Sequence, residues 1–233
     1  MAKVYAFVAD GMEEVECLAV CDCLRRAKVD VKLVSIMGRK MVTGSHGFKI
    51  EADSLFEEIT DDADVLFLPG GLAGTNNLKA HEGLAGMLKA HAAAGKRLAA
   101  ICAAPSILGE LGLVKGHRAT CYPGFETKME GADCRGDGVI TDCLISTGRG
   151  MGWAIDLGLE LIKLLVSEEE AERIKTAIQY IKKPRICADT GIHQKALECP
   201  VHQGIPFWRG TPLKECQERQ IWQSAPGKNQ EKP

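Results

Sequence analysis

The chain has 233 residues, of which 45% are hydrophobic and 26% charged, with a formal net charge of -2. This is the composition of a globular protein with enough chain for a full core, and its near-neutral charge argues against nucleic acid or an anionic membrane as the main partner. No apolar run approaches the ~20 residues that span a bilayer. The chain enters a strand pattern at Lys3 with no signal-peptide architecture, so we expect a cytoplasmic protein.

In the first half of the chain, strand and helix patterns alternate. Strands are expected at 3–9, 29–37 and 64–68, helices at 13–27, 53–59 and 78–94, and a small hairpin at 41–50. The 64–68 strand (DVLFL) is apolar from Val65 onward and ends at Pro69-Gly70-Gly71. An unbroken apolar run bounded by turn formers is typical of a strand buried on both faces.

The second half continues the alternation. Strands are expected at 98–101, 118–121, 138–142 and 144–146, and helices after Pro105, at 152–166 and at 167–182, the last opened by a Ser167/Glu170 capping box. The pattern predicts an α/β domain over 1–182, a mostly parallel sheet with helices on both faces. Residues 183–233 lose this periodicity, so we expect an irregular, poorly ordered C-terminal tail.

The ten cysteines are scattered and form no C-x-x-C pair, so we expect free thiols. Two groups of metal-ligand residue types occur: Cys17, Cys21 and Cys23 on one expected helix, and Cys187, His193, Cys199 and His202 in the tail. Neither spacing matches a standard metal-binding unit. We therefore expect no metal and no organic cofactor.

Cys102 lies where an apolar strand turns sharply into a helix. Residues 98–101 are apolar, Ala103 and Ala104 are small, and Pro105 suits the first turn of a helix. This is the layout of a nucleophile elbow, in which backbone N–H groups and the start of a helix favour the thiolate. The alternative is a buried structural cysteine, and the local pattern alone leaves both open.

Gly70 and Gly71 follow a strand whose carboxyl end belongs to the same edge of the expected sheet. Without side chains, their amides approach a bound oxygen closely, and with the N–H of Ala103 they predict an oxyanion pocket opposite the Cys102 sulfur. The alternative is an ordinary strand-to-helix turn.

Glu16 lies one turn into the first expected helix, whereas Glu13 and Glu14 are placed to face solvent at the helix start. If Glu16 points inward beside the Cys102 thiol, burial and like charge raise its pKa, and the carboxyl holds a proton that it can donate to sulfur. From spacing alone, a solvated glutamate is the more common case.

Four motifs together resemble the ThiJ/PfpI superfamily, in the branch of the parkinsonism-associated deglycase. They are DGMEEVE at 10–16, LPGG at 68–71, AICAAP at 100–105 and STGRG at 146–150. The resemblance covers roughly residues 1–182 and leaves the tail outside. It implies a flavodoxin-like three-layer sandwich, a homodimer, Cys102 as the reactive cysteine, Glu16 as its protonated partner, and Gly70, Gly71 and Ala103 as the oxyanion pocket.

Two positions depart from the pattern of this branch. Tyr122 stands where close relatives often carry a histidine; a tyrosine donates a hydrogen bond but is a poor base near neutral pH. His46 aligns approximately with an arginine that some relatives contribute from the partner subunit. Ala103 takes the place of the histidine that follows the cysteine in the protease-like branch, which argues against a peptidase.

The resemblance implies a glutathione-independent enzyme that converts the reactive dicarbonyl methylglyoxal to D-lactate, or removes methylglyoxal adducts from amines and thiols. Its substrate is thus a small dicarbonyl or a glycated group, and its chemistry begins with a covalent bond to Cys102. The alternative is a redox sensor or chaperone whose Cys102 is oxidised while turnover stays incidental.

Overall fold

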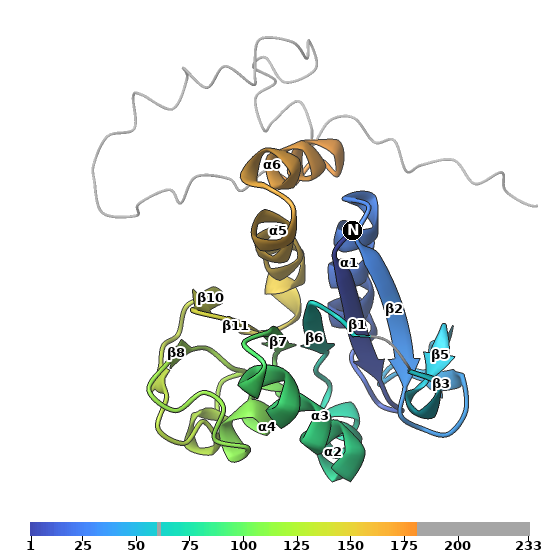
Figure 1. Ribbon diagram of the computed structural model, residues 1–233, viewed down its shortest axis with the longest axis vertical. Coiled ribbons are helices and arrows are strands. Elements are labelled where there is room, and N and C mark those ends of the chain that lie inside the picture. The colour runs from blue at the N-terminus through green and yellow to red at the C-terminus, as the bar shows by residue number, and fades with distance from the viewer. Residues whose placement is uncertain (60–61, 181–233) are drawn as a thin grey trace, which may run out of the picture. The chain divides into compact units, whose positions relative to one another are not determined.

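The computed structural model describes residues 1–59 and 62–180, so the expectations for residues 183–233 lie outside it. In the described part, the main sheet has seven strands in the order β10-β11-β7-β6-β1-β2-β5 (Figure 1). Only β10 and β11 pair antiparallel in this sheet, which confirms the mostly parallel arrangement. The strands are β1 (Lys3–Val8), β2 (Asp30–Ser35), β5 (Ser54–Leu55), β6 (Val65–Leu68), β7 (Arg97–Ile101), β10 (Val139–Asp142) and β11 (Ile145–Gly148).

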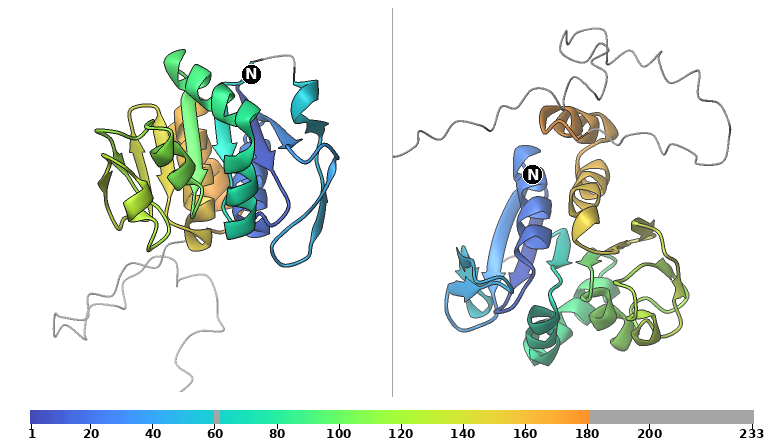
Figure 2. Two further views of the ribbon diagram at one scale, coloured as in Figure 1. Left: turned by 90° about the horizontal axis from the view of Figure 1, so that it is seen from below. Right: turned by 180° about the vertical axis from the view of Figure 1, so that it is seen from behind.

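Helices cover both faces of this sheet (Figure 2). One apolar cluster joins the sheet to α1 (Glu14–Arg26), α5 (Ala154–Leu165) and α6 (Glu168–Ala177). The other joins it to α2 (Leu72–Ala80), α3 (Glu82–Ala93) and α4 (Pro105–Glu110). Along β1, Val4 and Ala6 enter the first cluster and Tyr5 and Phe7 the second, as the two-residue period of a strand requires. The three-layer, flavodoxin-like α/β fold is confirmed.

The three cysteines of α1 belong to the core between this helix and its neighbours. Cys17, Cys21 and Cys23 are buried, and a side chain at Gly158 of α5 would come within 2.9 Å of Cys23 Cβ. They pack as small apolar side chains where α1 and α5 approach closely.

The helix expected at 78–94 is wrong in its extent, because the chain breaks at His81. The backbone of His81 is extended, with φ -86° and ψ 100°, so α2 ends before it and α3 starts after it. Its ring accepts a hydrogen bond from the Leu84 N–H at 3.0 Å and thereby caps α3. An imidazole in the role usually taken by Ser, Thr, Asp or Asn hides this boundary from the sequence.

The helix expected at 53–59 is also wrong. Ser54 and Leu55 form β5, the edge strand beside β2, and only a 3₁₀ turn at Phe56–Glu58 follows. The hairpin expected at 41–50 is confirmed as β3 (Met41–Thr43) and β4 (Lys49–Glu51). Among the described residues, no helix is both long and apolar enough to cross a membrane.

Candidate active site

The carboxyl ends of β6 and β7 bring two of the candidate segments together. These strands are parallel neighbours, with Leu68 opposite Ala100, so Gly70 and Cys102 leave the sheet side by side. The start of α1 joins the same edge, because Glu13 N–H donates to the Gly70 carbonyl at 3.0 Å. This is the edge where open α/β sheets place their ligands.

Cys102 occupies a strained turn that the backbone holds on both sides. Its φ is 65°, in the left-handed region that a non-glycine residue enters at a cost of about 1–3 kcal/mol. Cys102 N–H donates to the Gly148 carbonyl at 2.8 Å, and its own carbonyl accepts from Tyr122 N–H at 2.7 Å. The half-buried side chain is therefore presented in one fixed direction, as the elbow pattern predicts.

Glu16 points inward rather than toward solvent, with only 1% of its surface exposed. Its Oε2 accepts a hydrogen bond from Gly70 N–H at 3.0 Å. Among the described residues, no group meets its buried Oε1 with hydrogen-bond geometry. An unpaired buried carboxylate oxygen is costly, so this oxygen is the natural place for a proton.

Burial raises the pKa of Glu16 to about 7, and the charge of Glu13 adds to the rise, while hydrogen bonding with Cys102 and Gly70 opposes it. Desolvation is the cause expected from the sequence. The like charge is that of Glu13 and not that of a Cys102 thiolate, because the hydrogen bond with Cys102 lowers the pKa of Glu16. At neutral pH a substantial fraction of Glu16 therefore carries a proton.

The Cys102 thiol does not lose its proton easily while Glu16 is charged, contrary to the expectation from the elbow alone. Burial, the charge of Glu16 and its hydrogen bond raise the pKa of Cys102 to about 12, although the N–H groups of Gly71 and Ala103 pull it down. Two groups this strongly coupled titrate as a pair. A thiolate at Cys102 therefore requires Glu16 to hold the shared proton.

The backbone of Gly70 lies against both Glu16 and Cys102, with no room for a side chain. A Cβ at this position would lie 2.4 Å from Glu16 Oε2 and 2.6 Å from Cys102 Cβ, distances that real Cβ atoms do not tolerate. Its N–H is already engaged by Glu16, so of the three amides expected in the oxyanion pocket, those of Gly71 and Ala103 are the ones directed at the sulfur.

Gly71 has a conformational reason to be glycine. Its φ is +85°, and a Cβ there would approach Glu13 N and Gly11 O within 2.5 Å. The turn after β6 therefore packs backbone to backbone against the loop before α1.

Tyr122 borders the elbow through its backbone, and its side chain is exposed. The ring packs edge-on against Phe125, with centroids 6.5 Å apart. No described contact links the Tyr122 hydroxyl to Glu16 or Cys102, so the structure assigns it no proton-transfer partner.

His46 contacts Glu14 rather than Cys102. The backbone N–H of His46 donates to Glu14 Oε1 at 2.8 Å. The other carboxylate oxygen, Oε2, lies 3.1 Å from His46 Nδ1 and accepts a hydrogen bond from Ser45 Oγ, also at 3.1 Å. Glu14 is only 4% exposed, so the expectation that it faces solvent is wrong. Burial acts to raise the pKa of Glu14, but these hydrogen bonds outweigh it and lower the value to about 2.

The burial of Glu14 depends on the β3–β4 hairpin, including Gly44, and could not be predicted from the sequence. A Cβ at Gly44 would come within 2.2 Å of Glu14 Oε1, so the carboxylate lies directly against the hairpin backbone. The pairing joins residues 32 positions apart, and nothing in the local pattern of either segment indicates it.

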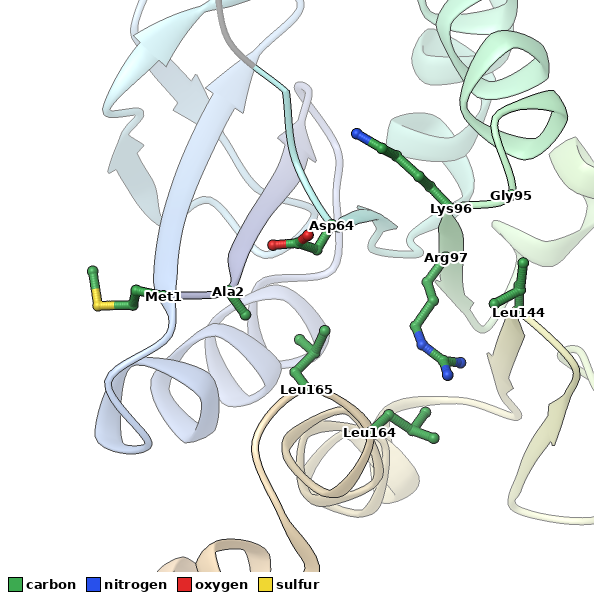
Figure 3. A pocket seen from close by; sticks show the side chains of 9 residues that line it. All are labelled: Met1, Ala2, Asp64, Gly95, Lys96, Arg97, Leu144, Leu164 and Leu165. Atoms are coloured by element: carbon green, nitrogen blue, oxygen red, sulfur yellow. The ribbon is translucent and has the colours of Figure 1, made fainter.

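A separate cavity of about 460 Å³ lies at the other end of the strands, where their amino ends are (Figure 3). It is lined by Met1, Ala2, Asp64, Gly95, Lys96, Arg97, Leu144, Leu164 and Leu165. These residues surround the amino ends of β1, β6 and β7, whereas Cys102 follows the carboxyl end of β7. The cavity therefore belongs to a different part of the molecule from the candidate site.

Comparison with known proteins identifies a family. A family model described as the DJ-1/PfpI family matches residues 2–164. Protein DJ-1 homolog B of Arabidopsis thaliana is 38% identical over 175 residues, covering 74% of this chain but 40% of that protein. The chain thus spans less than half the length of this plant relative.

Two further comparisons match nearly whole proteins. A protein of Pyrococcus abyssi named a deglycase is 33% identical over 166 residues, covering 70% of this chain and 99% of that protein. The solved structure of oxidized Toxoplasma gondii DJ-1 superposes with a TM-score of 0.75 at 33% identity, covering 78% of this chain and all of that one.

Proposed function

The chain belongs to the DJ-1/PfpI family, and from that premise we propose that it is a cysteine-dependent enzyme that detoxifies reactive dicarbonyls without glutathione. The observation that carries the proposal is the pairing of a half-buried thiol with a buried carboxyl whose pKa is raised to about 7. A proton carrier and a nucleophile that act as a pair require neighbouring groups with strongly shifted pKa values. Glu16 and Cys102 have such values, at the end of the sheet where folds of this class bind ligands. Methylglyoxal is the proposed substrate and D-lactate the product.

The first step is nucleophilic attack. Cys102 Sγ, as thiolate, bonds to the aldehyde carbon of methylglyoxal, and the N–H groups of Gly71 and Ala103 face the charge that develops there. Glu16 gives its proton to the carbonyl oxygen, which yields a neutral hemithioacetal and leaves Glu16 as a carboxylate.

Glu16 then acts as a base. It removes the proton from the former aldehyde carbon and returns a proton to the neighbouring carbon, which converts the adduct into a lactoyl thioester. Water hydrolyses the thioester, releases D-lactate and restores the pair. One methylglyoxal and one water give one lactic acid, so no external oxidant or reductant is needed.

Deglycation shares the covalent step at Cys102. The Pyrococcus abyssi relative is named a deglycase, and in this version the carbon attacked belongs to an early methylglyoxal adduct of an amine or thiol. We rank the glyoxalase chemistry first, because buffer-catalysed reversal of such adducts mimics deglycation.

A redox-sensing or chaperone role is the second candidate. The Glu16 carboxyl beside Cys102 is placed to hydrogen-bond a sulfinic acid formed by oxidation of that thiol. Saturable turnover of methylglyoxal, lost in Cys102→Ser, supports the enzyme. Rapid oxidation of Cys102 without turnover supports the sensor.

We also propose a homodimer in the cytoplasm. Large apolar side chains are exposed on the first two turns of α1 and on the β3–β4 hairpin, with Phe48 67% exposed; the set is Val15, Leu18, Met41 and Phe48. The two elements are joined by the Glu14–His46 contact, so these side chains offer one region for a second copy to cover.

A further inference from the structure

Two cysteines outside the proposed mechanism lie in direct contact. Cys121 Sγ and Cys134 Sγ are 3.7 Å apart. Cys121 is 4% exposed and Cys134 is partly exposed. Both are free thiols, and neither touches the nucleophile Cys102 through any described side-chain contact.

The backbone holds the segments that carry these cysteines side by side. β8 (Arg118–Ala119) pairs in parallel with β9 (Asp133–Cys134), and Ala119 lies opposite Cys134. Arg135 N–H donates to the Ala119 carbonyl at 2.9 Å, which extends the pairing past Cys134. The sulfur contact is thus a consequence of strand pairing between segments 13 residues apart.

We propose that Cys121 and Cys134 form a reversible intramolecular disulfide when the protein meets a hydroperoxide. The sulfurs are in van der Waals contact, and a bond needs them to close to about 2.05 Å. Cys134, the more exposed thiol, is the one the oxidant reaches.

The chemistry balances with hydrogen peroxide as oxidant. The Cys134 sulfur attacks the peroxide, which breaks the O–O bond and gives a sulfenic acid and one water. The Cys121 sulfur then attacks the sulfenic sulfur, forms the S–S bond and releases a second water. Two thiols are oxidised by two electrons in total, and one peroxide is reduced.

The proposed cross-link lies next to the turn that holds Cys102. Cys121 precedes Tyr122, whose N–H donates to the Cys102 carbonyl at 2.7 Å. A disulfide ties this segment to β9 and closes the loop of residues 122–133. It should raise the melting temperature by a few degrees, because it restricts the unfolded chain.

The sequence makes the test direct. Trypsin cuts after Arg118, Lys128 and Arg135, so Cys121 and Cys134 fall in adjacent peptides, 119–128 and 129–135, each with a single cysteine. The full-length reduced protein is treated with equimolar hydrogen peroxide, capped with an alkylating agent, digested without reductant and analysed by mass spectrometry.

We expect peptides 119–128 and 129–135 to appear as one species lighter by two hydrogen atoms than their sum, and to separate after dithiothreitol. Cys134→Ser, at the partly exposed position, should abolish this species, and Cys143→Ser, at an exposed cysteine, should leave it intact. Recovery of both peptides alkylated, or carrying sulfinic acid, while Cys102 is oxidised would overturn the proposal. So would a cross-link from Cys134 to any other cysteine.

Discussion

The N–H of Gly70 donates to Glu16 Oε2 at 3.0 Å, and this single bond aims the carboxyl of α1 across the turn after β6 at Cys102. The glycine has two duties at once. Its N–H holds Glu16 Oε2, and because it has no side chain it leaves room for that oxygen and for Cys102 Cβ beside it.

Gly70→Ala should therefore inactivate the enzyme. The added Cβ would meet Glu16 Oε2 at 2.4 Å and Cys102 Cβ at 2.6 Å, which forces the pair apart. A displacement of this kind costs on the order of 10²-fold in kcat/KM. The measurement is methylglyoxal consumption by the purified variant.

Gly86→Ala is the matched control, because a Cβ at Gly86 meets nothing within 4 Å. This substitution in α3 should leave activity unchanged and stabilise the helix slightly. Equal activity of Gly70→Ala and wild type would show that Gly70 does not position the pair.

Glu16 should make the protein less stable as the pH rises. Burial raises its pKa from 4.5 to about 7 in the folded state, so between these values the unfolded chain loses a proton that the folded chain keeps. The free energy of unfolding then falls with rising pH across this window, by up to about 1.4 kcal/mol per pH unit from this group.

Glu16→Gln removes the titration, so urea unfolding from pH 4.5 to pH 7 should show a shallower decline than in wild type. Parallel declines in the two proteins would mean that Glu16 does not hold its proton in the folded state.

Much of this arrangement was predictable from the sequence, because β1, β6 and β7 are apolar runs that end in turn residues. The Cys102 elbow follows from one such run with small residues after it. The inward direction of Glu16 does not, since a glutamate in the first turn of a helix is usually solvated.

Other features depend on contacts between distant segments. Glu14 is buried because the hairpin wraps it with Ser45 and His46, and α3 starts late because His81 caps it. The strand expected at 118–121 contains β8, but its two-residue partner β9 is too short for periodicity to reveal, so the contact between Cys121 and Cys134 was also hidden.

Glu14 should protect the protein against acid. Burial opposes ionisation, but hydrogen bonds from His46 and Ser45 prevail and lower the pKa from 4.5 to about 2. The stability it contributes is complete above pH 4.5 and lost as pH falls toward 2.

Glu14→Gln should consequently unfold at a higher pH than wild type in an acid titration followed by circular dichroism. Glu172→Gln, which alters an exposed carboxylate paired with Lys175, provides the comparison and should behave as wild type. Identical acid midpoints for Glu14→Gln and wild type would show that the hydrogen bonds from His46 and Ser45 to Glu14 do not stabilise the protein against acid.

The proposed dimer depends on exposed apolar side chains of α1 and the hairpin. Phe48→Asp combined with Val15→Asp should halve the molar mass measured by light scattering, because a charge in a covered apolar contact is costly. Val166→Ser, at an exposed apolar residue just after α5, should keep the wild-type mass. A double variant that remains dimeric would place the interface elsewhere.

The central claim is that Cys102 and Glu16 act together as nucleophile and proton carrier. It is tested most directly by D-lactate formation from methylglyoxal, without glutathione, in wild type, Cys102→Ser, Glu16→Gln and the control Cys143→Ser. We predict saturable turnover in wild type and Cys143→Ser, and its loss in both site variants. Full activity in Cys102→Ser, or no turnover in wild type, would contradict the account.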